Sequence, residues 1–231
     1  MKKFLVVAFM LLSFTSAKAL EGVNVGVSIM AGVFEADGAS EKFEGSHSIS
    51  GVANVTKKSS AEGENAEGLF GVGSLFVEKT LSDKVAFGLD FVPYALESEE
   101  AVNTQNTGTT GNGVDSESAN KVQVDFENLI TLYAIAKGDT GVYGKVGYVQ
   151  VDVVTNENLA TGGSYGDTDL SGYTVALGYD KGLDDGKFIR LEANYMDLGG
   201  ATLTNKNDAT KKVSADGITG YGAKLSIGKS F

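Results

Sequence analysis

Residues suited to catalysis are scarce in this chain, whose single histidine is His47. It lies in the segment GSHSIS, between Ser46 and Ser48, and a serine beside a histidine could supply an activated hydroxyl nucleophile. Side chains of adjacent residues in an extended segment point to opposite sides, so neither serine is well placed for activation by this imidazole. The pattern favours a solvated loop histidine and predicts a protein that is not an enzyme.

Carboxylates gather at two other places, GDTDLSG from Gly166 and LDDG from Leu183. Neither has the ligand spacing of a calcium-binding loop. The Asp-Gly pair of the second segment is typical of a turn. The chain also has no cysteine, so an exported protein must be stable without disulfides. We therefore predict no metal and no cofactor.

A third group of reactive side chains consists of charged residues in the middle of alternating apolar segments. Each of them falls opposite the apolar positions of its segment, and the group comprises Asp90, Lys145, Arg190, Glu192 and Lys224, with Glu78 as a further candidate. On strands, these side chains would share one face and meet in an interior, where opposite charges make burial tolerable. This predicts a polar network, which is either structural or the gate of a narrow conduit.

The elements that carry these charges are predicted to be strands, because apolar residues recur at every second position. The chain contains 31 glycines, which disfavour helices, and one proline, Pro93. Eight segments show this period, at about residues 23–34, 69–81, 85–94, 122–136, 142–154, 172–180, 188–195 and 221–231. In the fourth segment, the pattern puts Val124, Phe126, Ile130 and Leu132 on the apolar face.

Connections between these segments alternate in length. Short ones fall at residues 82–84, 138–141 and 182–187, and long polar ones at about 36–68, 97–121, 155–171 and 199–216. In an up-and-down barrel, this alternation puts the short turns on one rim and the long loops on the other. Strands formed around Ile49, Val52 and Val55 would raise the count from eight to ten.

The apolar face of each segment could point into a soluble barrel or outward into lipid. The opposite face is mostly Gly, Ala and Ser, with few of the charges that a solvated surface carries. Aromatic residues fall near the segment ends, as membrane-interface girdles require: Phe87, Phe91, Tyr173, Tyr179, Tyr195, Tyr221 and Phe231. The sequence therefore predicts an all-β fold, a transmembrane up-and-down antiparallel β-barrel of eight strands with short periplasmic turns and long extracellular loops.

The first 19 residues have the features of a secretory signal peptide. Lys2 and Lys3 precede an apolar stretch that is too short to cross a bilayer, and an A-x-A site ends at Ala19. We expect residues 1–19 to be the signal peptide and residues 20–231 the barrel domain. The formal charge is −11, which argues against a nucleic-acid partner.

With its alternating strands and its end, YGAKLSIGKSF, the chain resembles the small eight-stranded outer-membrane barrels that include the OmpA transmembrane domain, OmpX and the opacity-type surface proteins. The resemblance implies that the barrel assembly machinery reads an outward-facing C-terminal signal, here Phe231 and Ile227. Lys229 departs from the pattern, since an apolar or aromatic residue is common at that place.

The expected location is the cell outer membrane of a Gram-negative bacterium, with outer-membrane lipid as a partner. The expected role is non-enzymatic, in envelope integrity or in contact with an extracellular partner through the long loops. A narrow porin-like channel for ions or small solutes is the alternative, and a lipid-modifying enzyme is a third.

Overall fold

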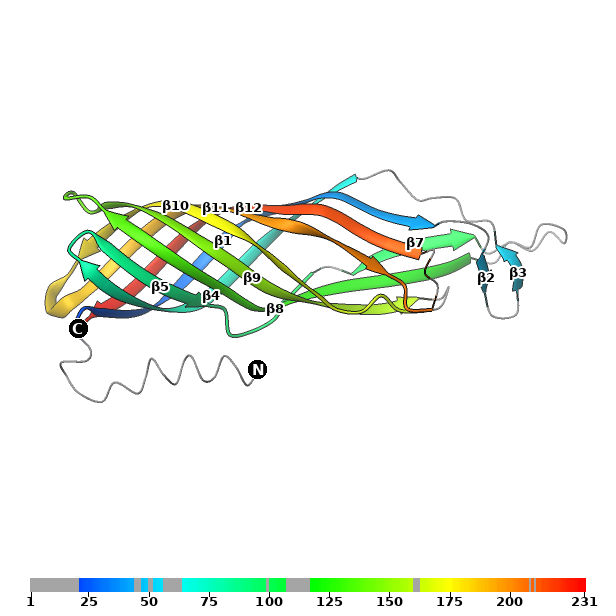
Figure 1. The fold of residues 1–231 in the computed structure, drawn as a ribbon, viewed down its shortest axis with the longest axis horizontal. Helices are drawn as coiled ribbons and strands as arrows, with labels where there is room; N and C mark the ends of the chain where they lie inside the picture. Colours follow the sequence, from blue (N-terminus) through cyan, green and yellow to red (C-terminus); the bar gives the residue numbers. More distant parts are fainter. Residues whose placement is uncertain are drawn as a thin grey trace.

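The computed structural model describes residues 21–43, 47–49, 52–55, 64–98, 100–106, 117–159, 163–207, 209 and 211–231. Most of these residues are in strands (Figure 1). Within these ranges, no helix has the length and hydropathy that crossing a bilayer requires. The expected signal peptide, residues 1–19, lies outside the described residues and stays a prediction.

Twelve strands follow one another along the described chain. Their bounds are β1 Val23–Phe43, β2 His47–Ile49, β3 Val52–Val55, β4 Glu64–Ser82, β5 Val85–Phe91, β6 Leu96–Glu97, β7 Ala101–Asn106, β8 Glu117–Lys137, β9 Val142–Leu159, β10 Thr168–Gly182, β11 Lys187–Thr204 and β12 Lys211–Ser230. A 3-10 turn, η2 (Asp184–Gly186), joins β10 to β11.

Eight of these strands close into an antiparallel barrel. The pairing runs β1–β4–β5–β8–β9–β10–β11–β12, and β12 returns to β1 along a register that starts at Asn24↔Ser230. β2 and β3 pair only with each other, so the ten-strand alternative is wrong for the described chain. The eight-stranded transmembrane barrel predicted from the sequence is confirmed.

The strands continue well past the length that a membrane requires. β1 and β8 have 21 residues each, whereas about 9–11 residues suffice for a transmembrane strand. The short turns and both termini of the described chain lie at one end of the barrel (Figure 1). At the opposite end, the strands extend beyond the barrel. The predicted loop at 97–121 is therefore partly wrong, because β7 pairs there with β8 from Ala101↔Val122 to Asn106↔Glu117. Backbone hydrogen bonds between strands do not require an apolar face, so hydrophobic alternation could not predict the strand β7.

The apolar faces point outward, as predicted. On β1, Val27 and Ile29 are 54% and 65% exposed, and on β10 Leu177 is 66% exposed. The band on β1 runs from Val25 to Val33, which spans roughly 21 Å at about 3.4 Å per residue and a tilt of about 40°. This height matches the apolar band of a membrane barrel.

Neighbouring strands contribute an aromatic belt at the outer edge of this band. Tyr173 of β10, Tyr195 of β11 and Tyr221 of β12 form a row, with ring centroids 6.2 Å and 5.1 Å apart. Tyr173 also donates a hydrogen bond to Asp197, at 3.0 Å. An apolar ring with a hydrogen-bonded hydroxyl suits the boundary between lipid and water.

One strand departs from the predicted alternation. The pairing of β8 with β9 shifts between Glu127 and Ile130, and Asn128 has a φ of 52° there. This bulge reverses which side chains face inward, so Phe126 lines the interior while Leu132 is 54% exposed. The single apolar face predicted for Val124, Phe126, Ile130 and Leu132 is therefore wrong.

Candidate functional site

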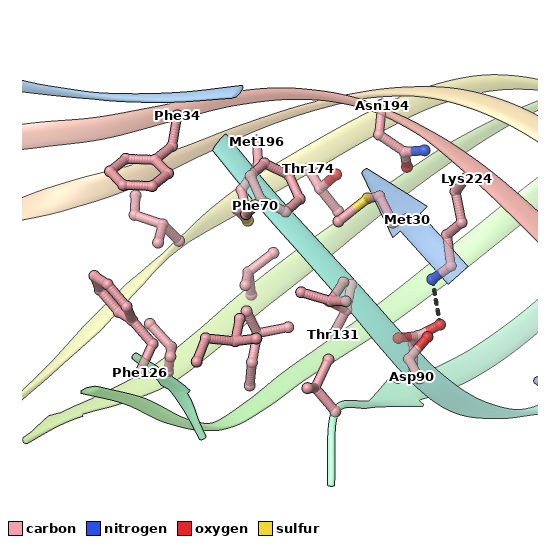
Figure 2. A pocket seen from close by; sticks show the side chains of 18 of the residues that line it. Met30, Phe34, Phe70, Asp90, Phe126, Thr131, Thr174, Asn194, Met196 and Lys224 are labelled. Atoms are coloured by element: carbon pink, nitrogen blue, oxygen red, sulfur yellow. Dashed lines mark hydrogen bonds and ion pairs between the residues drawn. The ribbon is translucent and has the colours of Figure 1, made fainter. Parts of the chain in front are cut away.

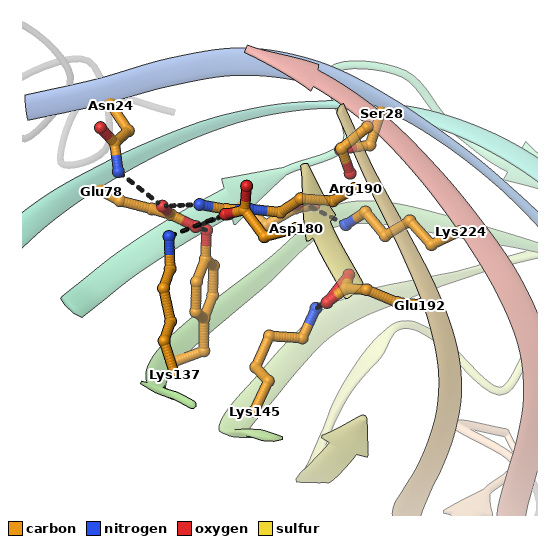
Figure 3. A network of polar contacts seen from close by, with 12 residues as sticks. Asn24, Ser28, Glu78, Lys137, Lys145, Asp180, Arg190, Glu192 and Lys224 are labelled. Carbon is orange, nitrogen blue, oxygen red and sulfur yellow. Dashed lines mark hydrogen bonds and ion pairs between the residues drawn. The ribbon is translucent and has the colours of Figure 1, made fainter. Parts of the chain in front are cut away.

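The lumen near the short turns is filled by an ion-pair network centred on Glu78 of β4 (Figure 3). Its carboxylate accepts hydrogen bonds from Arg190 Nη1, from Arg190 Nη2 at 2.8 Å, from Asn24 Nδ2 at 3.1 Å and from Tyr133 Oη at 2.9 Å. The Glu78 side chain is fully buried. Four donors make burial of this charge tolerable.

Arg190 of β11 connects Glu78 to a second acid. Its Nε donates to Asp180 Oδ2 of β10 at 2.8 Å, and Lys137 Nζ of β8 donates to the same oxygen at 2.7 Å. The Arg190 guanidinium also lies 4.4 Å from the centroid of the Phe188 ring. Stacking on an aromatic face and a forked carboxylate contact together fix this side chain.

Two further ion pairs lie beside this group. Lys145 Nζ of β9 donates to Glu192 Oε2 of β11 at 2.8 Å, and Lys224 of β12 pairs with Asp90 of β5. The network thus contains four cations and four carboxylates: Lys137, Lys145, Arg190 and Lys224 with Glu78, Asp90, Asp180 and Glu192. Its formal charge is zero, and with Asn24 every barrel strand contributes to it.

Little space remains between these side chains. The void among them measures about 10 Å³ and is lined by residues that include Ser28, Glu78 and Arg190. That is close to the smallest volume that holds one water molecule. We call these eight charged residues and the side chains packed on them the lumen plug.

The five residues singled out from the sequence all face this lumen, but they do not form one connected group. Arg190 and Glu192 have no contact with each other among the described interactions; Arg190 binds Glu78 and Asp180, while Glu192 binds Lys145. Sequence reasoning missed Asp180 and Lys137. The signal for Asp180 was present, because it alternates with the outward-facing Tyr179 at the end of its strand.

Above the lumen plug, the barrel interior becomes apolar and encloses a cavity of about 470 Å³ (Figure 2). The side chains of Phe34, Phe70, Phe126 and Met196 point into it, and the Asp90–Lys224 ion pair lies at its floor. Val149 and Val151 of β9 and Leu198 form its buried apolar wall, and they pack with Val153 and Leu170 in one hydrophobic cluster. A polar lumen alone was expected, so this outer cavity is a second feature that sequence reasoning missed.

The apolar wall has a recognisable origin in β9. Val146 and Tyr148 are exposed on the outside, whereas Val149 and Val151 are each 1% exposed and face inward. The apolar positions change parity at this point without a break in the pairing with β10. Outside the membrane, the outward face must be polar, and the inward face then becomes the apolar one.

The proposed assembly residues lie on the outward face beside the seam between β1 and β12. Phe231 and Ile227 are 49% and 54% exposed. The backbone N–H of Phe231 donates to the carbonyl oxygen of Val23 at 2.9 Å, and Lys229 Nζ lies 5.1 Å from the Phe231 ring centroid. The C-terminal residue is thereby held against the first strand.

His47, the candidate catalytic residue that the sequence argument rejected, lies in β2 and so away from the barrel strands in the pairing. Among the described residues, no group of three or more His, Cys, Asp or Glu side chains could hold a metal ion. The buried hydroxyls of Ser28 and Ser226 are hydrogen-bonded to each other at 2.9 Å.

A closed antiparallel barrel of eight strands, with an apolar outer band edged by aromatic residues and a polar lumen, is the architecture of an outer-membrane β-barrel protein. The chain has this fold and spans the outer membrane of a Gram-negative bacterium.

No protein-family model matches the sequence, and no curated protein matches it either. Solved structures of similar architecture include Neisserial surface protein A, with 10% identity over 91% of this chain and 98% of that one and a TM-score of 0.42. Outer membrane protein AlkL has 13% identity over 91% of this chain and 90% of that one, with a TM-score of 0.46. The outer membrane protease OmpT of Escherichia coli has 12% identity over 92% of this chain and 97% of that one, with a TM-score of 0.37.

A barrel architecture leaves the activity open. Any assignment of function must come from this chain's own side chains.

Proposed function

We propose that this protein is a non-enzymatic wall protein of the outer membrane, with no open pore, that presents protruding strands for contact outside the cell. The observation that carries the proposal is the lumen plug. Four cations and four carboxylates from seven of the eight barrel strands meet there in pairs, with a void of only about 10 Å³ between them. A narrow barrel filled in this way is a structural element of the membrane.

Contact with an outside partner is supported by the length of the strands. β11 and β12 pair as far out as Thr204↔Lys212, well above Tyr195↔Tyr221 in the aromatic belt. Such a ladder holds its outer connections away from the lipid surface. The lipid itself is the partner of the outward band, and we assign Phe231 and Ile227 to recognition by the barrel assembly machinery.

The absence of catalysis is supported by the state of the buried acids. Glu78, Asp90, Asp180 and Glu192 each bind a cation directly, and none is left to accept a proton from a substrate. An assay of lipid modification with purified protein in lipid vesicles should therefore detect no product.

Swelling of protein-containing liposomes in sugar solutions tests the closed lumen. The unmutated protein should give no swelling above protein-free vesicles. Replacing Arg190 and Lys224 together with serine removes two long cationic side chains that line the void of the plug, and this variant should leak ions that the unmutated protein retains. Sugar-dependent swelling with the unmutated protein would favour the channel alternative.

A further inference from the structure

The wall of the barrel is incomplete beside the outer cavity. β4 pairs with β5 only from Leu75↔Phe91 to Ser82↔Val85, whereas it pairs with β1 as far out as Ala39↔Glu64. β5 ends at Phe91, and the next strands, β6 and β7, pair with β8 alone. Residues 67–74 of β4 thus have a neighbour on one side and, within the described chain, no strand on the other.

Pro93 explains why the strand stops there. It follows Phe91 by two residues, has no N–H to donate to a ladder, and disfavours regular strand pairing in the middle of a sheet. The chain leaves the sheet at Val92 and returns at Leu96, now beside β8 only. We call the space between residues 67–74 and residues 92–96 the lateral gap.

The exposed edge of β4 is only partly satisfied at this gap. The backbone N–H of Gly73 donates to the hydroxyl of Tyr94, which replaces one missing ladder bond. Gly71 has the same strand parity, so its N–H and C=O also point toward the gap. A Cβ added at Gly71 would meet nothing within 4 Å, which shows that its outward side is open.

The lateral gap lies at the level of the lipid. Leu69 of β4 is 85% exposed and pairs with Val33, which in turn pairs with Tyr221 of the aromatic belt. Leu75, at the other end of the gap, is 52% exposed. The gap therefore occupies the outer part of the band that faces the membrane.

Both borders of the gap also line the outer cavity. Leu69 and Gly71 come from one side, and Ala95 and Leu96 from the other. Leu69 and Gly71 are also exposed on the membrane-facing surface, so the same residues border both the cavity and the lipid. The cavity volume of about 470 Å³ falls in the range of small-molecule sites, and its lining is mostly apolar.

Within the described chain, one buried side-chain polar atom of the lining has no hydrogen-bond partner. The amide nitrogen Nδ2 of Asn194 is buried and makes no hydrogen bond in the described chain, and the residue lines the cavity. By contrast, the charges at the floor are already paired: Lys224 with Asp90 and Lys145 with Glu192. Glu97 is the remaining charged residue of the lining, and it is exposed and anionic. Within the described chain, the site therefore offers a free donor to an uncharged acceptor and no unpaired cation to an anionic group.

We propose that the outer cavity binds a single hydrocarbon chain ending in an uncharged hydrogen-bond acceptor, and that this chain enters sideways from the outer leaflet through the lateral gap. The apolar wall takes up the hydrocarbon, Asn194 Nδ2 donates to the acceptor, and the lumen plug prevents passage along the barrel axis. Binding at this site is independent of the closed-lumen function, because the ligand never crosses the plug.

Fluorescence quenching tests occupancy, since the chain has no tryptophan. Phe70→Trp puts a single indole in the cavity, and Phe87→Trp puts one on the lipid face, where Phe87 is 53% exposed. In phosphatidylcholine vesicles, 10-bromodecan-1-ol should quench the cavity reporter saturably, and unlabelled decan-1-ol should reverse this. The lipid-face reporter should respond linearly. Parallel linear quenching of both reporters would show that no chain occupies the cavity.

The route is tested with a matched pair of variants in the Phe70→Trp background. Gly71→Phe puts a ring at the gap, and Gly144→Phe puts the same ring on the outward face of β9, where an added Cβ also meets nothing within 4 Å. When the probe is supplied from preloaded vesicles, Gly71→Phe should slow quenching at least about tenfold, an added barrier of about 1.4 kcal/mol. Gly144→Phe should leave the rate unchanged. Equal rates for the two variants would refute lateral access.

The role of Asn194 is tested by comparing two probes. Asn194→Leu should weaken saturable binding of 10-bromodecan-1-ol about fivefold to tenfold, the effect of one lost hydrogen bond. Binding of 1-bromodecane, which lacks the hydroxyl, should not weaken. An equal loss with both probes would contradict the assigned acceptor. Retention of the native electrophoretic form by each variant controls for folding.

Discussion

Replacing Arg190 with methionine should destabilise the barrel more than any other single change in the lumen plug. Arg190 supplies two of the four hydrogen bonds that Glu78 accepts and is its only cationic partner among the described residues. Asp180 would keep Lys137, but Glu78 would remain buried with Asn24 and Tyr133 alone. A stranded buried charge costs about 3–5 kcal/mol.

Adding Glu78→Gln to Arg190→Met should recover part of this loss, because the second change removes the stranded charge. Coupling between the two sites should amount to about 1–3 kcal/mol. The measurement is the free energy of unfolding in denaturant, followed by circular dichroism in lipid vesicles. An exposed ion pair provides the control: Lys84 and Asp139 are 2.9 Å apart with side chains 63% and 84% exposed. Lys84→Met should cost less than about 1 kcal/mol.

Additive losses for Arg190→Met and Glu78→Gln would refute this reasoning, because they would mean that the two charges do not depend on each other. So would a loss for Arg190→Met no larger than that for Lys84→Met.

Two further changes test packing and the lateral gap, each by the free energy of unfolding. Gly178→Ala should cost about 1–3 kcal/mol, because the new Cβ would lie 2.5 Å from Cζ of Tyr143. Gly144→Ala should be neutral, because a Cβ there would meet nothing within 4 Å. Equal effects of the two substitutions would contradict the packing account. Tyr94→Phe should cost about 1–3 kcal/mol by leaving the Gly73 N–H without an acceptor, and no loss would show that this edge is satisfied in another way.

Strand alternation was enough to predict much of this molecule. It assigned the outward face of β1 from residues such as Val27 and Ile29, because a two-residue period directly determines which side chains share a face. It also placed Arg190, Glu192 and Lys224 inside, since each falls opposite an apolar position. The partners were harder to predict, because strands far apart in sequence face one another across the lumen, as Glu78 and Arg190 do.

Other features depend on local breaks in the pattern. Asn128, with its positive φ, lies where the register of β8 shifts. Hydrophobic periodicity alone does not distinguish such a bulge from a strand that continues to alternate. The parity change at Tyr148 and Val149 was visible in the sequence, but its meaning required knowing where the membrane ends. The lateral gap follows from Pro93 only once the partner of β4 is known.

The outward extension of the strands was likewise only partly predictable. Residues 199–216 show alternation around a polar tip, and β11 and β12 do run to Thr204 and from Lys211. The segment around Asn103 has no such signal, because residues 103–106 of β7 are all polar and the pairing with Asn120 rests on the backbone. Hydrophobic periodicity indicates which side chains are buried, so it is absent where paired strands are surrounded by water.

Single-channel recording in a planar bilayer tests the central claim, that the lumen plug closes this barrel, most directly. The unmutated protein should show at most small and irregular current, because a void of about 10 Å³ provides no continuous water path. The Arg190→Ser, Lys224→Ser variant should conduct more. Steady, porin-sized conductance from the unmutated protein would contradict the account.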